Sequence, residues 1–214
     1  MRSTFYAQWY VTIAPTGLTG MFEIETREIM KTQHWTLQDL ELLPDDGSRY
    51  EIVDGELYLS TQPHMHHQIV CGNIFALLAQ WCNQTHNGMA IFAPGVIFTN
   101  DNAVVPDVVW ISYERYATAL QADGKFHSCP ELVIEVLSPG AENKRRDREV
   151  KLKLYSRRGA REYWVVNWQE RTLEVYRRQE GVLELDKTLD ENDSFQSPTL
   201  SGFHCRVDQL FTQL

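Results

Sequence analysis

Apolar and polar residues follow one another along the chain in a way that predicts both helices and strands. Thr36 precedes LQDLELL, whose leucines recur at helical spacing, so we expect a short helix that begins there. The segment YEIVDGELYLS has Asp54-Gly55 between two short β-like runs, which predicts a hairpin. Residues 69–81 have the apolar content of a buried helix.

The middle of the chain is rich in β-branched and aromatic residues. Three strand candidates, MAIFA, GVIFT and AVVPDVVWI, are divided by Pro94-Gly95 and by Asn100-Asp101-Asn102. A loop or short helix is expected over residues 113–128. The segment ELVIEVLS is almost continuously apolar at strand length, which favours a central strand covered on both faces.

The last third begins with residues 143–158, whose composition favours a helix that ends at Gly159, in the position of a C-cap. EYWVVN, TLEVYR and VLELD are further strand candidates, and the tail closes on residues 207–214. This order predicts a mixed α/β (α+β) fold, in which one central mixed sheet is flanked by helices. With 214 residues, 43% of them hydrophobic, one domain is the expectation.

The first 29 residues show no clear periodicity, whereas Met30-Lys31 directly precede the first helix signal. We interpret residues 1–29 as an N-terminal extension that is either not native or poorly ordered, and residues 30–214 as the domain. The apolar patch FYAQWYVTIA lacks the basic start and cleavage site of a signal peptide. No later stretch reaches the roughly 20 apolar residues of a membrane span, so no membrane association is expected.

The cysteines stand far apart and form no CxxC pair, at Cys71, Cys82, Cys129 and Cys205. This spacing argues against a zinc site and against a dense disulfide framework, and we expect a cytoplasmic protein. The sequence has no P-loop, dinucleotide fingerprint or GxSxG elbow, so no small-molecule organic cofactor is expected.

The net charge of −9 argues against a nucleic-acid partner, but it conceals a local reversal. Residues 144–161 contain nine basic and two acidic side chains, so this segment has a charge of +7. Composition alone favours a solvated helix face, and the alternative is a strip that faces phosphates. The candidates for contacts to a DNA backbone are Lys144, Arg145, Arg146 and Arg148.

Two acidic residues lie inside apolar strand candidates. Glu135 stands within LVIEVL, where an unpaired carboxylate would cost several kcal/mol, roughly, so it requires a core ion pair or a metal or catalytic role. Asp107 stands within VVPDVVWI, where Pro106 indicates an edge or bulge, although an aspartate after proline is also a common turn residue.

Two carboxylates on neighbouring strands are the usual protein ligands of Mg²⁺, which leaves room for phosphate oxygens. A lysine near them could orient or help to deprotonate an attacking water. Lys151 is the candidate, because it lies in the helix after the Glu135 strand and four residues before Tyr155, so both can face the same side. Considered alone, Lys151 would be one more solvated lysine.

The segments RYEIVDGELYLS, HHQIV, VVPDVVWIS, ELVIEVLSPG, DREVKLKLY and GAREYWVVN follow one another in this order. From about Trp35 to the C-terminus the chain resembles the Uma-two family of restriction-endonuclease-like proteins, a branch of the PD-(D/E)XK nuclease superfamily. The resemblance implies a restriction-endonuclease-like fold, a divalent metal and phosphodiester hydrolysis. It also implies that Asp107, Glu135 and Lys151 are the catalytic core and that Glu51 is an auxiliary acid near the metal.

The chain departs from the superfamily pattern at one position, because Leu137 stands where a lysine is expected two residues after Glu135. Lys151 is the substitute that the family's pattern implies, although Lys153 or Arg148 could serve. His67 matches a recurrent family position, and a helix-start or packing role is favoured over metal ligation. Tyr155 and His67 are therefore auxiliary candidates, and a metal cluster at HMHH is disfavoured.

These observations favour a Mg²⁺-dependent DNA endonuclease, in which Mn²⁺ can replace Mg²⁺ and Asp107, Glu135 and Glu51 hold the ion. The alternative is a catalytically inactive nuclease fold used as a DNA-binding or regulatory module. A carboxylate-pair glycosidase is disfavoured, because nothing marks a sugar-sized cleft. Cleavage of both strands requires two active sites, so we expect a homodimer.

Overall fold

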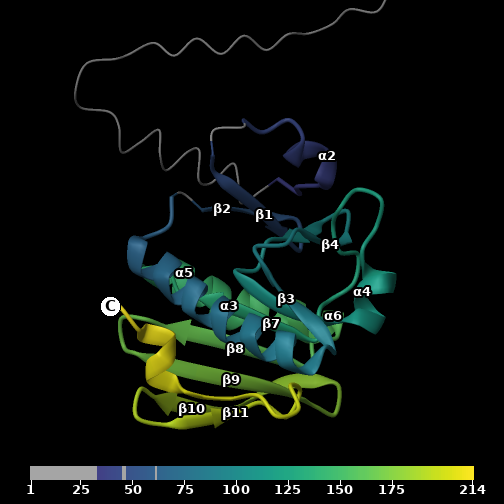
Figure 1. The fold of residues 1–214 in the computed structure, drawn as a ribbon. Helices are drawn as coiled ribbons and strands as arrows, with labels where there is room; N and C mark the ends of the chain where they lie inside the picture. Colours follow the sequence, from purple (N-terminus) through teal and green to yellow (C-terminus); the bar gives the residue numbers. More distant parts are fainter. Residues whose placement is uncertain (1–32, 45–46, 61) are drawn as a thin grey trace, which may run out of the picture. The chain divides into compact units, whose positions relative to one another are not determined.

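The computed structural model describes residues 33–44, 47–60 and 62–214, and from His34 to Leu214 these form one unit (Figure 1). The interpretation of residues 1–29 lies outside the described residues. None of the helices in the described ranges combines the length with the apolar character required of a membrane span.

The main sheet is mixed and has six strands. They follow in the order β10 (Val182–Asp190), β9 (Thr172–Gln179), β8 (Glu162–Asn167), β7 (Leu132–Val136), β6 (Val108–Ser112) and β3 (Gly88–Phe92). The pair β7 and β8 is parallel, whereas the other pairs are antiparallel. All five residues of β7 are buried, so the expectation of a covered central strand within ELVIEVLS is confirmed.

A smaller sheet has the order β2 (Glu56–Ser60), β1 (Arg49–Val53), β5 (Asn102–Val104) and β4 (Val96–Thr99). The strands β1 and β2 pair antiparallel, which confirms the predicted hairpin. Asp54 and Gly55 connect them with φ angles of 52° and 76°. Two successive residues with positive φ match the twist of a tight hairpin, which explains this dipeptide.

The prediction of one strand over AVVPDVVWI is wrong. Its first part forms β5 in the smaller sheet, and its second part forms β6 in the main sheet. Pro106 has no N–H to donate to a ladder, so the strand is interrupted there. As a result, Asp107 lies where the chain passes from one sheet to the other.

The predicted N-terminal helix is confirmed but shorter, because α2 spans only Leu37–Leu40, with a capping box between Thr36 and Asp39. The helix expected at residues 69–81 is α3 (Met65–Thr85), which begins one turn earlier. The segment expected as a loop or short helix contains α4 (Tyr113–Ala119). The tail forms β11 (Ser194–Gln196), β12 (His204–Arg206) and a 3-10 helix (Val207–Phe211).

The basic helix is present but is not regular. It consists of α5 (Ala141–Arg145), a π-helical turn (Arg146–Lys151) and α6 (Leu152–Arg158), and it ends at Gly159 as predicted. A π turn contains an extra residue relative to α geometry, so it rotates the side chains that follow it, and such turns are frequent at functional sites. Within this turn Arg146, Asp147 and Lys151 are buried.

The two faces of the main sheet belong to different cores. Leu132, Ile134 and Val136 of β7 pack in the cluster that includes α3, whereas Val133 belongs to the opposite cluster, which includes Tyr155 of α6. Because side chains alternate along a strand, Glu135 must point toward the α6 side.

Gly159 provides a test of the helix end. It adopts a φ of +89°, and a Cβ added there meets no heavy atom within 4 Å. Gly159→Ala should therefore lower the free energy of unfolding by about 1 kcal/mol through backbone strain alone, measured by urea denaturation.

Gly72→Ala is the matched control, because Gly72 lies within α3 and an added Cβ there also meets nothing within 4 Å. Alanine should stabilise this regular helical position by roughly 0.5–1 kcal/mol. Shifts of the same sign in the two variants would contradict the assigned helix end.

Candidate active site

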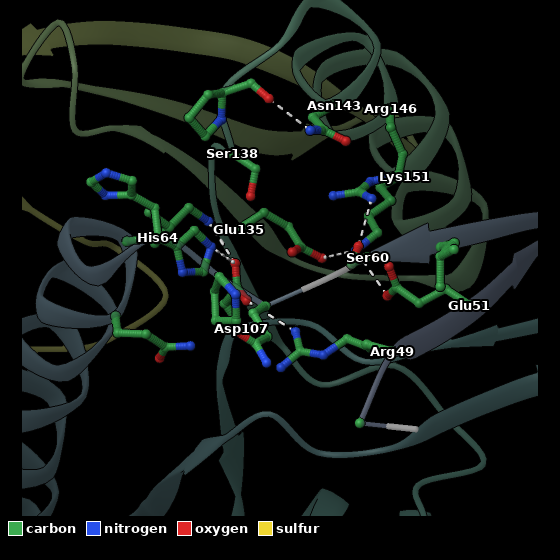
Figure 2. A pocket seen from close by; sticks show the side chains of 18 residues that line it. Arg49, Glu51, Ser60, His64, Asp107, Glu135, Ser138, Asn143, Arg146 and Lys151 are labelled. Carbon is green, nitrogen blue, oxygen red and sulfur yellow. Dashed lines mark hydrogen bonds and ion pairs between the residues drawn. The ribbon is translucent and has the colours of Figure 1, made fainter. Parts of the chain in front are cut away.

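A cavity of about 450 Å³ lies where the β1–β2 hairpin, the start of α3, the end of β7 and the basic helix meet (Figure 2). Its lining includes charged side chains of both signs that come from segments far apart in the sequence. Of the residues singled out from the sequence, it contains Glu51, His67, Asp107, Glu135, Arg146 and Lys151.

Glu135 points from β7 toward the basic helix, as the alternation of its strand requires. The ammonium group of Lys151 donates to its Oε1 over 2.9 Å, and the hydroxyl of Tyr155 donates to the same oxygen over 2.8 Å. Lys151 and Tyr155 therefore lie on one side of the helix, as their spacing of four predicts. Both described contacts end on Oε1, which leaves the other carboxylate oxygen for a further ligand.

Lys151 is a buried cation held between two carboxylates. Its side chain is 2% exposed, and Nζ lies 2.9 Å from Oε1 of Glu135 and 2.9 Å from Oε1 of Glu51. Burial lowers the pKa of a lysine, but here the two glutamates outweigh it and raise the pKa above its ordinary value. Lys151 is therefore a fixed positive charge and not a proton acceptor in this arrangement.

Glu51 comes from β1 in the smaller sheet. Besides Lys151, its Oε1 accepts a hydrogen bond of 2.7 Å from the backbone N–H of Val105. This second contact gives a hydrogen-bond partner to a backbone amide in the segment between β5 and β6. Glu51 thus ties the smaller sheet both to the basic helix and to the segment that leads to Asp107.

Asp107 is held by three donors of different kinds. Its Oδ2 accepts from the backbone N–H of Val136 over 2.9 Å and lies 3.2 Å from Nε2 of His67, while Nη1 of Arg49 lies 3.3 Å from Oδ1. Burial would raise the pKa of Asp107, but His67, the Val136 amide and Lys151 outweigh it and lower the pKa to about 2. Asp107 is therefore an anion at neutral pH.

Asp107 and Glu135 are neighbours across the main sheet. The register of β6 and β7 pairs Val108 with Ile134, so one step further along the ladder sets Asp107 beside Glu135. In contrast to Asp107, Glu135 has a pKa above its ordinary value. Burial is the main cause, the nearby acids Asp107, Asp147 and Glu51 add to it, and Lys151 opposes it.

Arg146 and Asp147 form a second buried ion pair next to the cavity. Nε of Arg146 donates to Oδ1 of Asp147 over 3.0 Å, and Nη1 donates to the hydroxyl of Ser60 over 3.0 Å. The backbone carbonyl of Asp147 accepts from the hydroxyl of Tyr163. Arg146, predicted as a DNA contact, therefore lies inside the cavity rather than on the helix surface.

The other basic candidates lie outside the cavity and have acidic partners. Lys144 lies 3.6 Å from Glu170, and Arg145 lies 3.4 Å from Glu149 one helical turn away. Arg148 donates to Glu174 over 2.9 Å. The positive charge of the segment is thus partly neutralised where it stands, and its contact with DNA stays a prediction.

Two residues of this site escaped the sequence analysis. Arg49 stands two positions before Glu51 in β1, and the period of two along a strand is the signal that places both on one side. Asp147 stands four positions before Lys151, which is the helical spacing that also relates Lys151 to Tyr155. In both cases a local spacing in the sequence indicates the position of the residue.

His67 contacts the site through both ring nitrogens. Nε2 faces Asp107, and Nδ1 lies 3.5 Å from the Sγ of Cys71 one turn further along α3. These three residues have ligand atoms within 4.8 Å of one another, a spacing that would suit a metal ion. Burial, Asp107 and Glu135 raise the pKa of the Cys71 thiol, which disfavours the thiolate that a metal would need.

A family model and a solved structure match this chain. The family model Uma2, described as "Putative restriction endonuclease", matches residues 37–208. The crystal structure of a "putative nuclease belonging to DUF820" from Anabaena variabilis aligns with a TM-score of 0.66 and 20% identity, over 82% of this chain and 97% of the other. No curated protein matches. At 20% identity, the structural similarity shows a shared fold alone.

The burial of Lys151 generates a stability prediction. Lys151→Met leaves two buried carboxylates without their cation, so the metal-free protein should lose about 3–5 kcal/mol of unfolding free energy in urea at pH 8. Protonation of Glu135 relieves this cost. Because a raised folded-state pKa stabilises the fold at low pH and loses that effect as pH rises, the loss should be smaller at pH 5.

Lys153→Met is the matched control, because Lys153 is exposed on the same helix two residues away. It should change stability by no more than about 0.5 kcal/mol at either pH. Equal effects of the two substitutions would show that the contacts of Lys151 with Glu51 and Glu135 contribute nothing.

Proposed function

Because the chain belongs to the Uma2 family, we propose that it is a metal-dependent DNA endonuclease that hydrolyses phosphodiester bonds in the cavity around Asp107, Glu135 and Lys151. One observation supports this most directly. Two buried carboxylates lie side by side where β6 begins next to β7, and a buried lysine contacts one of them.

The donor set fits a hard divalent cation. Asp107, Glu135 and Glu51 offer carboxylate oxygens, and burial together with the nearby acids raises the pKa of Glu135, so a cation beside this carboxylate would stabilise its charged form. Mg²⁺ prefers such oxygen ligands and keeps several waters, and Mn²⁺ accepts the same set. We propose that Asp107 and Glu135 hold the ion and that Glu51 is an auxiliary ligand that also fixes Lys151. When bound, the ion would activate a water and stabilise charge on the phosphate.

Lys151 would orient the attacking water and hold a phosphate oxygen. Its raised pKa keeps the ammonium group protonated, so it acts as a point charge and hydrogen-bond donor and not as the general base. Its two glutamate contacts restrict its position, and a restricted donor needs little reorganisation when negative charge develops on the phosphate.

The arginines of the cavity would bind the rest of the phosphate group. Arg49 enters from β1 with a side chain that is 35% exposed, and Arg146 enters from the π turn. A guanidinium group presents several donors in a plane and suits phosphate oxygens. A homodimer would supply two such centres for the two strands of a duplex, as symmetric cleavage requires.

The first experiment is an assay of supercoiled plasmid and single-stranded DNA at low salt with Mg²⁺, Mn²⁺ or EDTA. Asp107→Asn and Glu135→Gln should each reduce metal-dependent cleavage by more than about 100-fold, because each removes a proposed ligand without a change of shape. Gel quantification of nicked and linear products gives the rate.

Glu131→Gln is the control for this assay. Glu131 is also buried, but it pairs with Ser112 and Arg115 outside the cavity, so its substitution should leave cleavage within about twofold of wild type. If folded wild-type protein cleaves no substrate, the proposal fails and a catalytically inactive binding module becomes the better description.

Lys151→Met should separate metal binding from turnover. The variant keeps the proposed ligands and loses a competing cation, so calorimetry should detect Mg²⁺ binding at least as tight as in wild type, while the cleavage rate falls by about 100-fold. Loss of Mg²⁺ binding in this variant would contradict the role assigned to Lys151.

A further inference from the structure

Three aromatic side chains form a cluster, and one of them, His64, lines the cavity. The ring of His64 stacks on that of Trp168 with centroids 4.9 Å apart and an angle of 16° between the planes. His66 meets both rings edge-on, at 4.9 Å from His64 and 5.1 Å from Trp168. His64 is exposed and lines the cavity (Figure 2), whereas Trp168 is half-buried.

This cluster is fixed relative to the proposed catalytic carboxylates. Nε1 of Trp168 donates over 3.0 Å to the carbonyl of Leu137, which lies two residues after Glu135. His64 is the N-cap of α3, and His67 follows three residues later and contacts Asp107. Both halves of the stack are therefore attached to segments that also hold the acids of the cavity.

Two apolar side chains, one next to His64 in the sequence and one in the cavity lining, are also exposed. Met65, the next residue after His64, is 71% exposed, and Leu59 of β2 lines the same cavity and is 47% exposed. The cavity floor, in contrast, consists of buried charges, with Lys151 and Glu135 no more than 3% exposed. A nucleotide has an aromatic base beside a charged phosphate. Exposed aromatic and apolar side chains beside buried charged groups can therefore contact both parts of it.

We propose that the exposed face of His64, supported by Trp168, stacks against an unpaired nucleobase of the DNA strand whose phosphate enters the cavity. This inference rests on the proposed nuclease function and adds a substrate class to it. A base inside a duplex has both faces covered by its neighbours, so stacking here requires a single-stranded or locally unpaired region. Such stacking tolerates any base, because every base has a π face.

The test compares two ligands with the same phosphates. One is a short fluorescent single-stranded oligodeoxynucleotide, and the other is a strand of equal length made of abasic residues. Binding is measured by fluorescence anisotropy with Ca²⁺ in place of Mg²⁺, and gels verify that the strands stay intact. Wild-type protein should bind the base-bearing strand about 5- to 100-fold more tightly, in keeping with one stacked base.

Two substitutions of His64 separate stacking from helix capping. In the wild-type protein, Nδ1 of His64 accepts a hydrogen bond of 3.2 Å from the backbone N–H of His66. His64→Asn keeps a good N-cap and removes the ring, so it should bind both strands equally, at the affinity of the abasic strand. His64→Phe removes the cap acceptor and keeps a ring, so it should retain the preference for bases. If His64→Asn kept the preference for bases and His64→Phe lost it, His64 would have only a structural role as the helix cap, and the proposal would be overturned.

Wild-type protein has two further outcomes. Equal binding of both strands overturns the stacking site and leaves the proposed nuclease intact, because phosphate contacts alone then account for affinity. Binding of neither strand overturns the stacking site together with the nuclease function on which it rests.

Discussion

The contact of Lys151 with two glutamates joins the parts of this fold that otherwise belong to separate sheets. Glu135 comes from the main sheet, Glu51 comes from the smaller sheet, and Lys151 comes from the helix that follows β7. An ammonium group and two carboxylates are costly to remove from water, so each is tolerable only because the others are present. The hydrogen bonds from Tyr155 and from the Val105 amide complete the set.

The burial of several charged groups at this centre costs stability, but it provides charges that can take part in a reaction. Burial, and to a smaller extent the neighbouring acids, raises the pKa values of Glu135 and Asp147, which means that their charged forms are disfavoured in this fold. A hydrophobic core of equal volume would not incur this cost. Pairs of acids with pKa values displaced in opposite directions, such as Asp107 and Glu135, are typical of functional sites.

Local patterns predicted much of the architecture. The continuous apolar run of β7, the Asp54-Gly55 turn and the Gly159 helix end could all be predicted from the sequence, and the spacing of four between Lys151 and Tyr155 predicted that they face the same side. The division of AVVPDVVWI between two sheets could not be predicted. A proline within a β-rich run indicates an irregularity, but it does not indicate which strands pair with each other. The pairing of Arg148 with Glu174 was equally hidden, since 26 residues separate them.

The passage of the chain from β5 to β6 has a mechanical consequence. Arg49 and Glu51 belong to the smaller sheet, whereas Asp107 and Glu135 lie side by side in the main sheet, where β6 begins next to β7. If the smaller sheet moved as a rigid body, its part of the cavity lining would move with it, including Arg49 and Glu51, the second partner of Lys151. Access to the cavity therefore depends on the smaller sheet, whereas the spacing between Asp107 and Glu135 is set by the pairing of β6 with β7 in the main sheet. The contact of Arg49 with Asp107 and the bond from the Val105 amide to Glu51 couple the two sheets.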